Sequence, residues 1–115
     1  MAKFSKYNSK KTVVDGITFD SKKEAIRYGQ LKLLKKSGVI LDFALQPEFP
    51  YMVMCYHPTD IMASYTVKRK YIADFAVTYP DYHVEVEDVK GYATAEFKRK
   101  KKIVENVYGI KIKII

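Results

Sequence analysis

The pattern of hydrophobic and polar positions begins with a hairpin. Two strand-forming triplets, residues 12–14 and 17–19, flank Asp15-Gly16, which is a strong signal for a two-residue turn. Five later stretches also have the composition of strands. These predicted strands cover residues 39–46, 49–56, 65–79, 82–90 and 110–115, with a predicted loop at 57–64.

Two segments with helical periodicity interrupt these strands. The first opens with the capping-box pair Ser21 and Glu24 and is expected to end at Gly38. The second is expected to begin after Thr94 and to end at Gly109. The expected buried stripes are Ala25, Tyr28, Leu31 and Leu34 in the first helix, and Phe97, Val104, Val107 and Tyr108 in the second. The order helix, strands, helix, strand predicts an α/β fold with a mixed central sheet flanked by helices.

Length and charge narrow the class of protein. The 115 residues suit a single domain, residues 1–115, in which the lysine-rich residues 1–11 are expected to form a flexible basic arm. The net charge of +8 is uneven, because basic ends flank residues 37–97, where nine acidic residues face four basic ones. Basic ends indicate a polyanionic partner, most commonly nucleic acid. A divalent cation would explain acidic residues in a protein that binds phosphate.

Several other classes of protein are disfavoured. No apolar run approaches the roughly 20 residues of a membrane span, and residues 1–4 lack a signal-peptide core. Cys55 is the only cysteine, so no internal disulfide can form and a reducing cytoplasm is expected. His57 and His83 are isolated, which argues against zinc. No glycine-rich phosphate loop is present, which argues against a nucleotide cofactor.

The strand around Asp88 carries the sharpest chemical signal. Because side chains alternate faces along a strand, Asp88 and Lys90 continue a row begun by Val84 and Val86, whereas Glu87 points to the opposite face. Burying charged groups is costly unless they are paired or bound to a metal. A structural ion pair between Asp88 and Lys90 is the alternative interpretation.

Asp74 repeats this anomaly in the preceding strand, where it lies between apolar neighbours. A tight turn near Asp81 would place Asp74 opposite Glu87 or Asp88, and only the second register puts two aspartates on one face. Two carboxylates that close repel each other, and a bound cation is the simplest remedy. The alternative for Asp74 is a hydrogen-bond acceptor at a strand end.

Glu24 is a third candidate acid, because the helical period directs it towards the sheet. Its structural alternative is a bond to the Ser21 amide in the capping box. Oxygen ligands of this kind favour Mg²⁺, with Mn²⁺ as a substitute. Lys90 could orient or deprotonate the attacking water, or stabilise charge in the transition state, and these three roles remain open.

These residues resemble the motifs of the PD-(D/E)XK nuclease superfamily. The resemblance rests on Glu24 in an early helix, on Asp74 in a Tyr-x-x-Asp-Phe strand, and on Asp88-Val89-Lys90 followed by Gly91. It extends to a family of small phage-encoded proteins, some regarded as Holliday junction resolvases. It implies a restriction-endonuclease-like αβββαβ core, Mg²⁺ bound by Glu24, Asp74, Asp88 and the Val89 backbone carbonyl, a catalytic Lys90, and DNA as substrate. One departure is that alanine, not proline, precedes Asp74.

Clustered basic residues are candidates for DNA binding. They are Lys22, Lys23, Lys68, Arg69, Lys70, Lys98, Lys100, Lys101 and Lys102. Either Lys100 or Lys101 is expected to reach the site, and the rest of the 98–102 cluster would form a solvated face that also attracts DNA. Lys68-Arg69-Lys70 either tracks a DNA backbone or is loop charge that serves solubility. Gln46 is a polar residue either near the site or in a turn.

The residues and the resemblance together predict a Mg²⁺-dependent DNA endonuclease, and the resemblance alone implies that its substrate is branched DNA such as a Holliday junction. Symmetric cleavage of a four-way junction would need a homodimer. If the protein is phage-encoded, the host cytoplasm is its expected location. The first alternative is a non-catalytic DNA-binding module that retains the nuclease fold. The second is a small structural or partner-binding protein.

Overall fold

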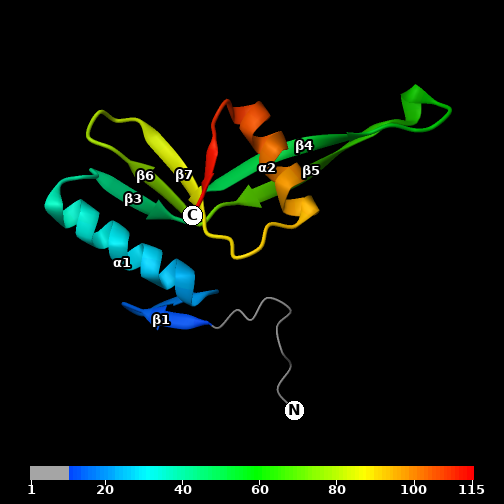
Figure 1. Cartoon of the computed structure of the whole chain (residues 1–115). Coiled ribbons are helices and arrows are strands. Elements are labelled where there is room, and N and C mark those ends of the chain that lie inside the picture. The colour runs from blue at the N-terminus through cyan, green and yellow to red at the C-terminus, as the bar shows by residue number, and fades with distance from the viewer. Residues whose placement is uncertain (1–10) are drawn as a thin grey trace, which may run out of the picture.

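A computed structural model describes residues 11–115 of the chain as a mixed α/β fold (Figure 1). The expected arm at residues 1–11 therefore lies outside the described residues except for Lys11. In chain order the elements are β1 (Thr12–Val14), β2 (Ile17–Phe19), α1 (Lys22–Ser37), β3 (Asp42–Leu45), β4 (Glu48–Cys55), η1 (Ile61–Ala63), β5 (Tyr65–Ile72), β6 (Phe75–Thr78), β7 (Val84–Asp88), α2 (Ala95–Tyr108) and β8 (Ile112–Ile114). None of the helices in this part of the chain is long and apolar enough to cross a membrane.

Local signals define both ends of α1, as predicted. The Ser21 hydroxyl accepts a hydrogen bond from the Glu24 backbone N–H at 3.1 Å, which satisfies a donor that the first helical turn leaves free. Gly38 follows the helix in the left-handed conformation, with φ of 84°. The helix therefore holds Glu24 in its first turn.

The central sheet has the strand order β3-β6-β7-β8. Its first three strands pair in antiparallel fashion, whereas β8 runs parallel to β7. A parallel neighbour needs a crossover, which α2 provides between the two strands. Without the β1-β2 and β4-β5 hairpins, which lie outside this sheet, the order is one helix, three strands, a second helix and a fourth strand. The predicted mixed sheet with two helices is confirmed.

Two apolar clusters form the core. The first joins α1 to β6 through residues that include Leu31, Phe75 and Val77. The second, beneath α2, includes Val86 and Val104. Val86 pairs with Ala76, whose side chain points to the opposite face of β6 from its neighbours Phe75 and Val77. The two clusters therefore lie on opposite faces of the sheet.

Some predicted boundaries were wrong. The predicted strand 65–79 is broken at Ala73-Asp74, because β5 pairs with β4 whereas β6 belongs to the central sheet. The strand predicted at 82–90 ends at Asp88, so Lys90 lies beyond it. Of the stripe predicted in α2 only Val104 is fully buried, whereas Val107 and Tyr108, in the last turn of the helix, are 59% and 40% exposed.

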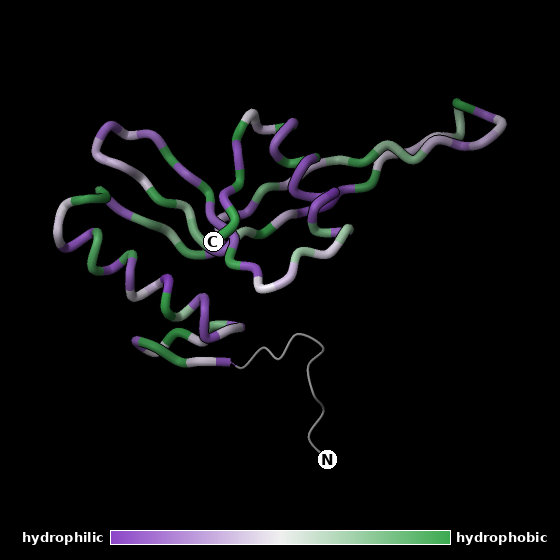
Figure 2. The backbone as a smooth tube through the Cα atoms, viewed as in Figure 1, coloured by the Kyte–Doolittle hydropathy of each residue, from purple (hydrophilic) through white to green (hydrophobic). Residues whose placement is uncertain are grey.

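The hairpin formed by β4 and β5 projects from the molecule as an arm (Figure 1). Its two strands pair over their full lengths, and η1 lies at the far end, within the predicted loop. The base of the arm packs on the second cluster through Tyr51 and Tyr71. Hydrophobic segments continue along the arm beyond this base (Figure 2).

Candidate functional site

Asp74 and Asp88 meet where the chain enters β6 and leaves β7. Phe75 pairs with Glu87, so the next position in the same register sets Asp74 against Asp88. The Val89 N–H donates to Asp74 Oδ2 at 2.7 Å, which holds the Asp74 carboxylate over the end of β7. The register that places both aspartates on one face is therefore the observed one.

Asp88 is buried with an incomplete set of partners. Its side chain is 1% exposed, and its Oδ2 accepts a hydrogen bond from the Tyr71 hydroxyl. Its Oδ1 accepts no hydrogen bond, although Lys90 Nζ lies 3.5 Å away. The Lys90 ammonium also lies 4.9 Å from the centre of the Phe97 ring. A buried carboxylate oxygen without a hydrogen bond is costly, so this atom is suited to receive a cation.

Glu24 approaches the same strand ends from the first turn of α1. With Asp74 it lines a pocket of about 130 Å³. The other lining residues are Ile17, Thr18, Phe19, Asp20, Leu45, Gln46 and Phe75. This pocket brings together Glu24, Asp74 and Gln46, three residues that lie in separate parts of the sequence.

The carboxylates of the site disfavour one another's ionised forms. Burial is the main cause that raises the pKa of Asp74, to about 7, and contacts with Asp88 and the charge of Glu24 raise it further. The pKa of Glu24 is also raised, first by burial and then by the charge of Asp20. The charge of Lys90 acts in the opposite direction on Glu24. A cation bound between these carboxylates would relieve this repulsion.

No group of three or more His, Cys, Asp or Glu residues within residues 11–115 is spaced to hold a metal ion. Asp74 and Asp88 are the two acids in direct contact, and Glu24 faces the same pocket from the helix side.

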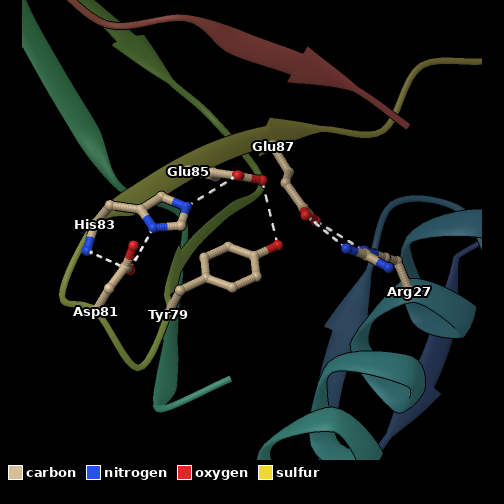
Figure 3. A network of polar contacts seen from close by, with 6 residues as sticks. All are labelled: Arg27, Tyr79, Asp81, His83, Glu85 and Glu87. Atoms are coloured by element: carbon tan, nitrogen blue, oxygen red, sulfur yellow. Dashed lines mark hydrogen bonds and ion pairs between the residues drawn. The ribbon is translucent and has the colours of Figure 1, made fainter. Parts of the chain in front are cut away.

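Glu87 has a different role from its neighbour Asp88. It is fully buried on the side of α1, where Arg27 Nε donates to its Oε1 at 2.8 Å and the second carboxylate oxygen also accepts from the guanidinium (Figure 3). Nearby, Tyr79 donates to Glu85, which also contacts His83. The sequence-based assignment of Glu87 to the opposite face is confirmed, and its carboxylate is already satisfied.

A family model matches residues 4–114, which is nearly the whole chain. The chain belongs to the family described as "Protein of unknown function (DUF1064)". No curated protein and no solved structure matches it.

In this member of the family, the predicted basic residues lie on three elements. Lys22 and Lys23 are exposed beside Glu24, and the three basic residues 68–70 are exposed on the arm. Lys98 and Lys102 are exposed on α2. These positions leave the basic side chains available to a polyanion.

Two lysines of α2 are engaged in pairs along the helix. Lys100 Nζ lies 3.0 Å from Glu96, and Lys101 Nζ lies 3.0 Å from Glu105. Glu105 also accepts from the Ile112 N–H at 2.7 Å, which ties α2 to β8. These contacts direct both ammonium groups towards acids on the helix instead of towards Asp88.

Sequence reasoning missed three residues of the site region. Tyr71 is the tyrosine of the Tyr-x-x-Asp-Phe motif, for which the sequence predicts no role. No role is predicted for Arg27 or Asp20 either. The spacing of Tyr71 from Asp74 is a local signal, but the bond from Tyr71 to Asp88 depends on the tertiary packing of residues 17 positions apart. Gln46, for which two roles were open, lines the pocket and has a positive φ of 51°, so it occupies both the site and a turn.

Proposed function

We propose that this protein is a Mg²⁺-dependent DNA endonuclease of the PD-(D/E)XK type that hydrolyses phosphodiester bonds in branched DNA, such as a Holliday junction. One observation carries the proposal. The half-buried Asp74 and the buried Asp88 meet at the ends of two strands, Asp88 Oδ1 accepts no hydrogen bond, and Lys90 is the adjacent cation. This combination destabilises the folded state and is suited to phosphoryl chemistry.

The order of elements supports the proposal. Apart from the β1-β2 hairpin and the arm, helix α1 precedes three antiparallel strands, and α2 precedes a strand parallel to the third. The restriction-endonuclease-like αβββαβ core has this order. It would place an acid on the first helix, an acid at the second strand and an Asp-x-Lys motif at the third, as Glu24, Asp74 and Asp88 are here.

The donor set suits Mg²⁺, with Mn²⁺ as a substitute. Asp74 and Asp88 would hold the ion with their carboxylate oxygens, and Glu24 and the Val89 carbonyl would complete the protein ligands. All of these donors are oxygens, which hard divalent cations prefer. When bound, the ion would polarise the scissile phosphate and lower the pKa of a bound water.

Lys90 would stabilise the negative charge that develops on the phosphate during hydrolysis. Its ammonium lies between the Asp88 carboxylate and the face of Phe97, and both contacts attract a cation. A positive charge held next to the reacting phosphate suits transition-state stabilisation better than proton removal. Of the three roles considered for Lys90, the geometry favours this one.

Basic side chains would hold the DNA over the pocket. Lys22 and Lys23 are exposed in the helical turn that carries Glu24, and Lys98 and Lys102 are exposed on α2. Phosphate contacts of this kind orient a nucleic acid without reading its sequence. Recognition of a branch by shape is therefore more consistent with this surface than recognition of a base sequence.

A panel of labelled four-way junction, flap, duplex and single-stranded DNA tests the proposal. The wild type is expected to cut the junction in Mg²⁺ and to leave it intact in EDTA. Asp88→Asn is expected to abolish cutting without unfolding the protein. Asp42→Asn is the matched control, because Asp42 is an exposed acid at the opposite end of the central sheet.

Two outcomes would contradict the nuclease proposal. Equal trace activity in the wild type and Asp88→Asn would mean that the cutting comes from a contaminant. Binding that is equally tight in EDTA and Mg²⁺, with no cutting, would identify the alternative function, a non-catalytic DNA-binding module.

A further inference from the structure

The arm formed by β4 and β5 projects away from the rest of the molecule (Figure 1). Its strands pair from Glu48–Ile72 at the base to Cys55–Tyr65 near the tip, and they form a separate two-stranded sheet. Within residues 11–115 neither strand has a second neighbour, so both outer edges present unpaired backbone groups. Exposed strand edges of this kind are templates for pairing with another chain.

The outer part of the arm exposes large apolar side chains. They are Met52, Met54, Tyr56, Ile61, Met62 and Tyr65, each about half exposed or more, with Met62 at 88%. Met52 and Met54 share one face of the arm, whereas Tyr65, which pairs with Cys55, lies on the other face. Exposed apolar side chains gathered at the end of an arm in this way mark an interaction site.

The charge of the tip favours a protein partner over DNA. Residues 56–65 contain no lysine or arginine, although the chain has 21, and Asp60 is their one acid. A tip that entered a DNA groove would need basic residues to offset the phosphates. The basic residues of the arm lie nearer its base, where Lys68 and Lys70 point to the same face as Met52.

We propose that the arm is the surface through which two copies of this chain associate. Two arms packed in antiparallel fashion about a two-fold axis would place the tip of each against the base of the other. Asp60 of one copy would then face Lys68 of the second, since Lys70 already pairs with Glu48 of its own chain at 3.4 Å. This contact between Asp60 and Lys68 would be repeated on both sides of the two-fold axis, as an isologous interface requires. This association does not depend on nuclease chemistry, but it would supply the two sites that symmetric cleavage needs.

Sedimentation of the full chain without DNA tests the association. The wild type is expected to behave as a dimer at micromolar concentration. The double variant Ile61→Asp/Met62→Asp is expected to weaken the dimer by about 100-fold or more, because it buries two new charges in each half of the contact. Leu33→Asp is the control, since Leu33 is an exposed apolar residue of α1 and its replacement should leave the dimer unchanged.

Hydrogen exchange provides a second readout for the same proteins. Amides of β4 and β5 should become more protected as the concentration of wild type rises, whereas those of α1 should not change. A wild type that remains monomeric, or tip variants that remain fully dimeric, would overturn the proposal. Tip variants that remain dimeric but lose DNA binding would instead assign the arm to the nucleic acid. Asp88→Asn should still dimerise, so the dimer proposal can be tested even if the nuclease proposal fails.

Discussion

Replacement of Asp74 by asparagine is expected to stabilise the protein in the absence of metal while abolishing its proposed activity. In the wild type, burial together with the nearby Asp88 and Glu24 raises the pKa of Asp74 to about 7. In Asp74→Asn the side-chain oxygen can keep the bond from the Val89 N–H, and the new amide group can donate to Asp88. The substitution therefore exchanges a repulsive contact for an attractive one.

The sign and size of the effect follow from proton linkage. A carboxyl group whose pKa is higher in the folded state than in the unfolded state weakens folding as pH rises between the two values. For Asp74 this window runs from about pH 4, near the ordinary value of 3.8, to about pH 7. For a completely buried group, the free energy of unfolding would fall by about 4 kcal/mol across this window. Because Asp74 is partly exposed, solvent screening lowers the expected loss to about 2 kcal/mol.

Urea denaturation in EDTA at about pH 5 and pH 8 measures this effect. Because the window opens below pH 5, the wild type should lose about 1 kcal/mol more than Asp74→Asn between these two pH values. The control Asp42→Asn should behave as the wild type, because Lys35 lowers the pKa of Asp42 and its titration falls below this range. Mg²⁺ at pH 8 should restore stability to the wild type and not to Asp74→Asn. Equal pH dependence in the wild type and Asp74→Asn would refute the reasoning that the site carboxylates repel one another.

Three further predictions concern residues around the site. Arg27→Met should cost about 3 kcal/mol in urea denaturation because it leaves Glu87 buried and unpaired, and adding Glu87→Met should recover most of that loss. Tyr71→Phe should change the free energy of unfolding by only about 1 kcal/mol. It should lower kcat about tenfold with little change in KM, because Asp88 loses the hydrogen bond that orients it. An unchanged kcat would leave Tyr71 with a packing role alone. Gln46→Ala and Gln46→Gly should reduce DNA cleavage equally if the amide acts in the pocket, and the glycine variant should be about 1 kcal/mol more stable because of the positive φ.

Local patterns in the sequence were sufficient to predict helices, register and side-chain faces. The bounds of α1 follow from Ser21 and Gly38, whose capping chemistry operates within a few residues. Alternation along strands separated Asp88 from Glu87, and a turn before His83 set Asp74 opposite Asp88. These features depend on periodicity and short-range geometry, which are properties of the chain itself.

Only the tertiary structure determined which strands pair and which distant side chains contact each other. The break before Asp74, which sends β5 into the arm and β6 into the central sheet, depends on strand pairing over long sequence separations. The bond from Tyr71 to Asp88 and the pairing of Arg27 with Glu87 join residues 17 and 60 positions apart. Burial, which raises the pKa of Asp74 and leaves Asp88 Oδ1 without a hydrogen bond, likewise arises when separate segments pack together. The sequence therefore identified the candidate site residues, and packing determined which of them are brought together and buried.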